Sequence, residues 1–364
     1  MATFSGQLRS NEIFSALYNM IISQEVFADN LGAHQTLVDK ARVDGGLYGD
    51  TKLYYSTDVL KSVPWGDDDE ATNLLALHRP EAPECQAIHL DIFRQICLTV
   101  DNYLSKRAWS TEGSFSSFNS IMLGWMKETK RVYDGTLYNV FIGTTKATGA
   151  GQTISVDLSG ATSLTGVEKE QMEAMLIAQK LADLMVAMGD YSRDFNDYGN
   201  LRSYAKDGIK VVWNSKFVNK IRKIDLPTIF HKDGLIDKFE EDILPERYFG
   251  DINTNQVAAS SNTGQYRSVL EKDYTVSGQP KPVHVFPGDK IPAGVIIAKG
   301  EGYTAPTKDV ICKVLVKLPP YMSAFEVGTS FFNPKSLTEN HYLTFGHNTI
   351  EYLKNYPFIT VEVK

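Results

Sequence analysis

Residues 113–141 read GSFSSFNSIMLGWMKETKRVYDGTLYNVF, and this stretch decides the class of fold. Apolar and small side chains recur in it at three- and four-residue steps, which predicts one continuous helix with a single buried face. At 1.5 Å per residue such a helix would be roughly 40 Å long. That length is typical of a spine that carries other elements. The predicted buried face consists of Phe115, Phe118, Met122, Trp125, Thr129, Val132, Thr136 and Val140.

The chain on both sides of this helix has an ordinary globular composition. It has 364 residues, of which 43% are hydrophobic and 22% charged, enough for two or three substructures with a sizeable core. The formal net charge of −7 argues against tight binding to nucleic acid. The three cysteines, Cys85, Cys97 and Cys312, are too few and too scattered for a disulfide framework, so we expect reduced thiols.

Neither targeting nor membrane segments are visible in the sequence. The start MATFSGQLRSNEIF lacks a basic region followed by an apolar core, so no signal peptide is predicted. Apolar runs stay well short of the ~20 residues that would span a bilayer. These patterns favour a protein made and used in a reducing cytosol.

The segments before the spine helix divide into a helix and an arm. Residues 11–31 carry apolar side chains at helical spacing and predict a helix. Residues 43–110 hold short extended runs such as KLYYSTDVL and QAIHLDIF, broken by Gly, Pro and acidic turns. A stretch this long with weak periodicity makes a poor core, so we expect a projecting β-rich arm.

The segments after the spine helix predict a mixed α and β region. TISVDL (153–158) and GIKVVW (208–213) predict strands, and a second long helix should begin at Thr165, where Thr165 and Glu168 match a capping box. The apolar face of this helix is expected to run through Ile177, Leu181, Leu184 and Met188, with a stop at Gly189. Short helices are predicted at 214–224 and 225–233, and loops with hairpins at 250–306. VICKVLVKL, HYLTFGH and FITVEVK predict strands, and YMSAFEVGTSFF (321–332) a helical or loop piece.

The glycine-rich stretch RVDGGLYGDTKLYY (42–55) invites comparison with a phosphate-binding loop. A P-loop needs GxxxxGK[ST] followed by a helix. Here Asp50 follows the last glycine, Thr51 precedes Lys52, and the next residues favour a strand. We therefore interpret the stretch as a bend in the arm. Candidate contacts with a neighbouring subunit are Leu47, Tyr48, Lys52, Tyr54, Tyr55 and Trp65.

Motifs for metal binding and catalysis do not emerge from the sequence. HExxH and HxH are absent, and Gly346 is expected to interrupt the strand that would join His341 and His347. No GxSxG elbow is present, and nothing ties Cys85 or Cys312 to a base. No catalytic residue, metal ligand or cofactor is therefore assigned, and the protein is expected not to be an enzyme. Lys216, Lys220 and Lys223 form a basic helix stripe that solvation explains most simply, with an acidic partner as the alternative.

The order of these elements resembles the major capsid protein of tailed bacteriophages, the Hong Kong 97-type fold. Two stretches carry the likeness most specifically. ARVDGGLYGDTKLYYSTDVLKS and FRQICLTVDNYLSKRAWS resemble the two legs of the extended loop that leads into the spine helix. The stretch 200–233 resembles the strand-then-helix unit of the axial domain in capsid proteins of short-tailed phages.

The resemblance implies an α+β fold with five regions. These are an N-terminal arm (1–41), an extended loop (42–110), a peripheral domain with the spine helix (111–164), an axial domain (165–325) and return strands of the peripheral domain (326–364). Residues 251–306 would be a β and loop insertion within the axial domain.

The resemblance also implies a structural role: self-assembly into hexamers and pentamers of an icosahedral head around double-stranded DNA. Scaffolding and portal proteins would be partners, DNA would be contacted weakly and without sequence specificity, and no membrane would be involved. The protein would be located in the virion after assembly in the host cytoplasm. Some members cross-link the extended loop through a lysine. Lys52 and Lys61 lie in the loop without an identifiable partner, so a non-covalent shell is predicted.

Two other readings of the sequence stay open. An encapsulin, a nanocompartment shell loaded with an enzyme, would share the fold. An α/β enzyme with an unrecognised acid/base pair in residues 165–250 would belong to a different class. Solution size separates the enzyme from both shells.

Overall fold

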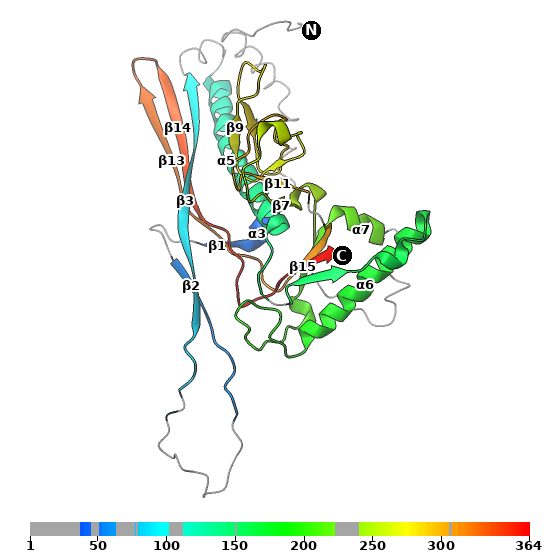
Figure 1. Ribbon diagram of the computed structural model, residues 1–364. Helices are drawn as coiled ribbons and strands as arrows, with labels where there is room; N and C mark the ends of the chain where they lie inside the picture. Colours follow the sequence, from blue (N-terminus) through cyan, green and yellow to red (C-terminus); the bar gives the residue numbers. More distant parts are fainter. Residues whose placement is uncertain are drawn as a thin grey trace, which may run out of the picture. The chain divides into compact units, whose positions relative to one another are not determined.

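Strand pairing and helix packing were taken from a computed structural model of the chain (Figure 1). It describes residues 37–44, 51–62, 77, 79–101, 112–149, 151–222, 240–305 and 308–364. The helices predicted at 11–31 and 225–233, and the glycines at 45–49, lie outside these residues. The chain divides into two units. The first comprises Met1–Asp50, His89–Tyr138 and Tyr321–Thr349, and the second comprises Thr51–Ile88, Asn139–Pro320 and Ile350–Lys364.

A five-stranded, mostly antiparallel sheet contains the strands of the first unit and also β2, whose residues belong to the second. Its strand order is β1-β13-β14-β3-β2, with β1 parallel to β13 and β3 antiparallel to β14 (Figure 1). The bounds are β1 Arg42–Asp44, β2 Thr51–Ser56, β3 Glu84–Asp101, β13 Tyr321–Asn333 and β14 Thr338–Asn348. A short helix, α3 (Leu37–Ala41), directly precedes β1.

Two predictions for this sheet were wrong. Residues 321–332 form strand β13, because pairing with β14 from Ala324 to Asn333 overrides their weak local pattern. Gly346 continues β14 opposite Phe93, and the Phe93 ring fills the space that a Cβ at Gly346 would occupy. The second leg of the expected arm includes the 18-residue strand β3, which pairs with β14 over most of its length.

The spine helix is confirmed as α5 (Glu112–Thr144), 33 residues or roughly 50 Å long. In the described part, its buried face agrees with the prediction at Val140 but not at every other predicted position. Trp125 and Val132 are exposed, whereas Met126 and Tyr133, each one residue later, are buried. The buried face also contains a lysine and an aspartate, so hydrophobic periodicity alone misplaces it.

A second five-stranded sheet forms the core of the second unit. Its order is β4-β15-β12-β5-β6, with parallel pairs at both edges and antiparallel pairs between. The bounds are β4 Thr153–Val156, β5 Lys210–Asn214, β6 Glu240–Leu244, β12 Val310–Leu315 and β15 Phe358–Val363. The predicted strands at 153–158, 208–213 and 310–318 are confirmed in type. The C-terminal strand lies in this sheet, so residues 326–364, grouped together in the sequence reading, divide between the two units after Thr349.

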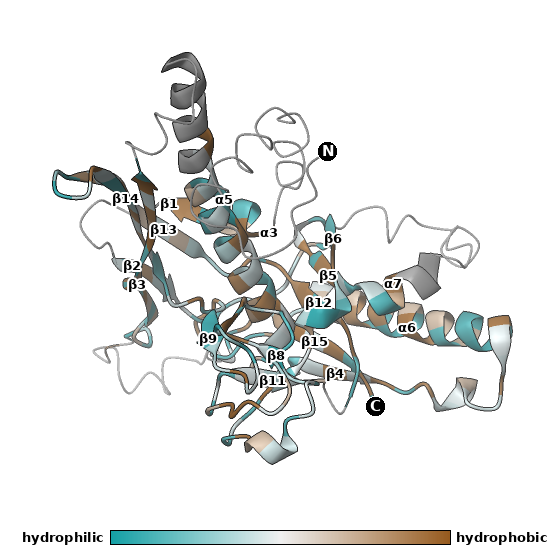
Figure 2. Ribbon diagram, turned by 90° about the horizontal axis from the view of Figure 1, so that it is seen from above, coloured by the Kyte–Doolittle hydropathy of each residue, from teal (hydrophilic) through white to brown (hydrophobic). Residues whose placement is uncertain are grey.

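Helix α6 (Gly166–Gly189) covers this sheet with its apolar face. Ile177, Leu181, Leu184 and Met188 are all buried, as predicted, and each such side chain contributes about 1.5–3 kcal/mol. Figure 2 shows hydrophilic and hydrophobic residues alternating along the helix, as one buried face requires. Helix α7 (Ser215–Arg222) packs beside α6.

The predicted capping box at the start of α6 does not form. Thr165 is the N-cap in extended conformation but makes no side-chain capping hydrogen bond. The next residue, Gly166, has φ of +63°. The chain therefore enters the helix through a left-handed backbone conformation, which glycine adopts easily.

Residues 251–304 form a small module with its own core. Its strands are β7 Asp251–Ile252, β8 Arg267–Ser268, β9 Lys272–Tyr274, β10 Val283–Val285 and β11 Gly302–Thr304, in sheets of order β7-β11-β8 and β10-β9. Asp251 at its start pairs with Thr304 at its end. Four 3-10 turns complete the second unit: η1 Ser159–Ala161, η2 Lys206–Gly208, η3 Glu246–Tyr248 and η4 Ala259–Ser261.

Candidate assembly surfaces

A buried ionic cluster fixes α5 onto β13 within the first unit. The Asp134 carboxylate, fully buried, accepts hydrogen bonds from Lys130 Nζ (3.1 Å) and from the Tyr321 hydroxyl (2.6 Å). Arg42 of β1 adds a longer contact at 3.4 Å. Burial, and then the neighbouring Asp134 charge, raise the pKa of Tyr321, so its proton stays in place. The cluster ties β1, α5 and β13 together through charged groups.

His347 extends this cluster without offering a free base. Its Nε2 lies 3.0 Å from the Tyr133 hydroxyl, and its Nδ1 lies 2.9 Å from the Asn348 carbonyl. The ring stacks on Tyr321 with 5.5 Å between centroids. Burial lowers the pKa of His347, which favours the neutral ring. With both nitrogens engaged, this histidine is suited to holding the strands rather than to moving protons.

The outer face of α5 carries apolar side chains that its own unit leaves open. Trp125 is 41% exposed and Val132 37% exposed. They lie seven residues apart, two helical turns, with Thr129 between them on the same face. The sequence reading selected these residues correctly as one stripe but assigned the stripe to the core.

The far end of the β13–β14 hairpin exposes aromatic side chains on both faces. Phe331 is 61% exposed and Phe332 is 48% exposed. Neighbouring residues of a strand point to opposite faces, so the described residues leave both faces open there. Leu337 in the turn is also exposed, with φ of +55°. The sequence reading missed these residues because it assigned no strand to 321–332, although NPKS followed by HYLTF is a usable hairpin signal.

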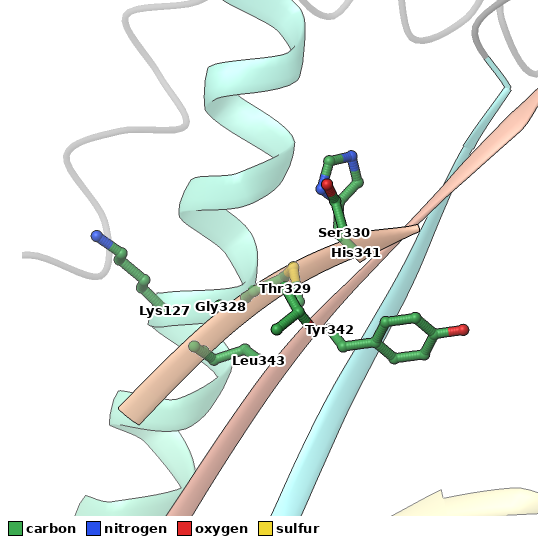
Figure 3. Close-up of a pocket in the computed structure, with 8 residues that line it drawn as sticks. Lys127, Gly328, Thr329, Ser330, His341, Tyr342 and Leu343 are labelled. Carbon is green, nitrogen blue, oxygen red and sulfur yellow. The ribbon is translucent and has the colours of Figure 1, made fainter. Parts of the chain in front are cut away.

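A groove of about 390 Å³ lies between α5 and this hairpin (Figure 3). Leu343 of β14 points toward the helix, whereas Tyr342 points to the opposite side of the sheet. The groove is lined by Met126, Lys127, Gly328, Thr329, Ser330, His341, Tyr342 and Leu343. Its walls are largely apolar, which suits a side chain or segment of another protein better than a charged metabolite.

The predicted contact residues of the arm are partly described. Lys52 and Tyr54 of β2 are half-buried, and Tyr55 is 65% exposed. Lys317 Nζ lies 5.7 Å from the Tyr54 ring, a cation–π contact within the second unit, and burial raises the pKa of Tyr54. Leu47, Tyr48 and Trp65 lie outside the described residues. Of the predicted set, Tyr55 is the aromatic side chain that the described structure leaves most open.

The second unit contains a buried lysine that the sequence reading missed. Lys313 of β12 is fully buried and donates to the Thr145 carbonyl and to Thr360 Oγ1, both at 2.7 Å. Burial lowers the pKa of this amine to about 7. Since its partners are neutral groups within the fold, it supports the sheet instead of opening a reactive site.

The basic stripe predicted around α7 is partly neutralised within the chain. Lys216 Nζ lies 2.6 Å from Asp309 and 3.8 Å from Glu246. The hydrogen bond that Lys216 donates to Asp309 is the main reason why the pKa of Lys216 is raised. Side chains of residues 219–223 are outside the described part, so the stripe is established only at Lys216.

Metal binding and membrane insertion find no support among the described residues. No cluster of three or more His, Cys, Asp or Glu side chains there could hold a metal ion. No described helix is both long and apolar enough to cross a bilayer.

Comparison with solved structures identifies the fold. The chain superposes on a capsid structure of Staphylococcus phage Andhra with a TM-score of 0.60 and 11% identity, over 91% of this chain and 85% of that one. It superposes on a structure of head fiber and inner core protein gp22 of native bacteriophage P68 with a TM-score of 0.56 and 10% identity, over 93% and 88% of the two chains. No protein-family model and no curated protein matches the sequence.

These matches show that the chain has the α+β fold of Hong Kong 97-type phage capsid proteins. The fold class expected from the order of elements is therefore confirmed.

Proposed function

We propose that this chain is the major capsid protein of a tailed bacteriophage, a structural subunit without catalytic activity. The observation that carries the proposal is the fold, shared with a phage capsid structure over 91% of the chain. In this proposal the spine helix belongs to the peripheral domain, and helix α6 and the strands β5, β6 and β12 belong to the axial domain.

The exposed apolar surfaces support self-association. A monomer in water gains nothing from Phe331 and Phe332 on two opposite faces of one hairpin, whereas a subunit between neighbours buries both. Trp125 and Val132 on α5, and Tyr55 on β2, add further open apolar side chains. Different surfaces meeting head to tail generate closed rings, which is how hexamers and pentamers form.

The charge supports a shell that does not bind its contents tightly. A net charge of −7 disfavours strong attraction to packaged DNA, so DNA would be contacted weakly and without sequence specificity. Scaffolding and portal proteins are expected as assembly partners, with assembly in the host cytoplasm and the finished protein located in the virion. The shell is proposed to be non-covalent; in the structure Lys61 Nζ forms an exposed ion pair with Glu81 at 3.2 Å.

Expression of the full chain, alone and with a scaffolding protein, tests the proposal. Negative-stain microscopy and analytical ultracentrifugation should show rings or closed shells, and boiling in SDS should release monomers. A stable monomer or dimer at every concentration would contradict a shell protein and favour the α/β enzyme. Shells that enclose a co-expressed enzyme and no genome would favour the encapsulin alternative, and a ladder in SDS would contradict the non-covalent shell.

A further inference from the structure

The end of β2 is fastened to the segment that follows α6 by a dense set of polar contacts. Asp58 is the centre of this contact, and its side chain is 23% exposed. Its Oδ1 accepts the backbone amides of Val59 (2.8 Å) and Leu201 (3.0 Å), and its Oδ2 lies 2.5 Å from Arg193 Nη1. Arg193 also donates to the Gly199 carbonyl at 2.7 Å. One carboxylate thus joins two segments that are 135 residues apart in the sequence.

A second layer of contacts holds the two residues before Asp58. Arg202 Nη2 donates to the Thr57 carbonyl (2.6 Å) and approaches Ser56 Oγ (3.3 Å). Asn200 Nδ2 donates to Ser56 Oγ at 2.7 Å. Residues 56–58 are therefore held by side chains on both sides of the backbone.

The segment that receives these residues is itself fixed. Asn196 Nδ2 donates to the Asn200 carbonyl (2.7 Å), and the Asn200 amide donates back to Asn196 Oδ1 (2.9 Å). Ser192 and Arg202 exchange backbone hydrogen bonds, both 3.0 Å long. This receiving segment is preformed, so Asp58 binds to a rigid support. We call Ser56–Asp58 together with Arg193, Asn200, Leu201 and Arg202 the Asp58 anchor.

The electrostatics keep the anchor closed over a wide pH range. The Leu201 amide, Arg193 and the Val59 amide together lower the pKa of Asp58 to about 2. The carboxylate is consequently charged at neutral pH, and the contact is not a pH switch in that range.

Immediately after the anchor the chain presents apolar side chains to solvent. Val59 is 51% exposed and Leu60 is 79% exposed. Exposed aliphatic residues bind a partner more tightly when their direction is set in advance, because less conformational freedom is lost on contact. The Asp58 anchor lies directly before Val59 and Leu60, and it can therefore set the direction of these two exposed side chains in advance.

We propose that Asp58 and Arg193 are positioning residues for assembly, which fix the direction in which Val59 and Leu60 are presented to a second copy of this chain. This inference rests on the proposed function, since only a self-assembling subunit has such a second copy. The contact residues predicted from the sequence did not include Asp58 or Arg193, and both of these residues lie in the second unit.

Three variants of the full chain test the inference: Asp58→Ala, Asp58→Asn and Arg193→Lys. Asp157→Asn is the matched control, because Asp157 also accepts a backbone amide, that of Ser159 at 2.9 Å, but lies outside the anchor. Hydrogen exchange at the Leu201 amide reports the anchor in the free subunit. Shell yield, measured by light scattering and microscopy, reports assembly, and urea unfolding shows whether each variant is folded.

In the free subunit, Asp58→Ala should accelerate exchange at Leu201 by about tenfold or more, because it removes a charged acceptor. It should also lower shell yield by about tenfold with little change in the urea midpoint. Asp58→Asn, which keeps one acceptor oxygen, should lie between Asp58→Ala and wild type. Arg193→Lys should retain most of the yield, and Asp157→Asn all of it.

Two results would overturn the inference while leaving the proposed function intact. The first is wild-type yield of shells from Asp58→Ala together with accelerated exchange at Leu201. The second is unchanged exchange at Leu201 in that variant. If Asp58→Ala fails to fold, the same two readouts on Asp58→Asn decide. A wild-type chain that forms no shells, yet shows a protected Leu201 amide, would instead refute the proposed function, and with it the positioning role.

Discussion

Replacing Lys313 by methionine should remove a pH dependence that this one buried amine imposes on stability. Lys313 is fully buried between Thr145 and Thr360, and burial lowers its pKa from 10.5 to about 7. Between these two pH values the unfolded chain holds a proton on this amine that the folded chain has released. Stability therefore rises with pH in that window, by about 1.4 kcal/mol per unit and up to roughly 4 kcal/mol between pH 7 and 10.

Urea unfolding of the dissociated subunit at pH 7, 8, 9 and 10 measures this effect in wild type and Lys313→Met. The difference between the two curves should grow with pH by a few kcal/mol. Burial raises the pKa of Cys312, so this thiol lowers the stability of the folded chain as the pH rises in alkali. Both proteins carry Cys312, so its contribution cancels when the two curves are subtracted. Val314→Ala is the matched control: it deletes a buried aliphatic group from the same strand, so it should lower stability by about 2 kcal/mol without changing the pH slope. Parallel curves for wild type and Lys313→Met would refute the reasoning.

Three further predictions concern assembly and packing. Phe331→Ser with Phe332→Ser should abolish shells while changing subunit stability by no more than about 0.5 kcal/mol, because both rings are exposed in the free chain; microscopy and urea unfolding measure the two effects. Gly143→Ala should destabilise by about 1–3 kcal/mol in thermal or urea unfolding, since its new Cβ would collide with the backbone of η3. Gly124→Ala in the same helix meets open space and should stabilise by about 0.5–1 kcal/mol. Asp134→Ala should cost about 2–3 kcal/mol, because it leaves a buried ammonium and a buried hydroxyl without their acceptor.

Each of these has a clear contrary result. Shells of normal yield from the double serine variant would show that the hairpin end is not an interface. Equal stabilities of the two alanine variants would mean that α5 does not approach η3 as described. A neutral Asp134→Ala would mean that the ionic cluster is solvated.

The sequence was most informative where local pattern and tertiary structure agree. The spine helix, the apolar face of α6 and the strands at β4, β5 and β12 follow from periodicity, because most of the side chains buried there are apolar, although Lys130, Asp134, Asn214 and Lys313 are buried as well. The order of these elements was sufficient to predict the capsid fold.

The features of the fold that were not predicted from the sequence depend on contacts that hydrophobic periodicity does not encode. Lys130 and Asp134 are buried as a pair, which shifted the true core face of α5 by one residue from the predicted one. Residues 321–332 became a strand through pairing with β14, and Phe93 compensates for Gly346 across the sheet. Asp58 and Arg193 are far apart in the sequence, and neither belongs to a motif, so only the three-dimensional structure brings them together.

The pairing of Asp251 with Thr304 makes the module between them a natural place to engineer the protein. Because the chain enters and leaves at adjacent positions, the intervening residues can be lengthened, exchanged or replaced by a short turn without changing the distance that the flanking chain must cover. Ile291 and Ile297 belong to a core of the module's own, whereas Tyr303 packs against Val140 and Tyr248 outside the module, so a graft should keep β7 and β11 and replace the residues between them. Under the proposed function, such a graft repeated over every subunit would give a regular array of the inserted domain.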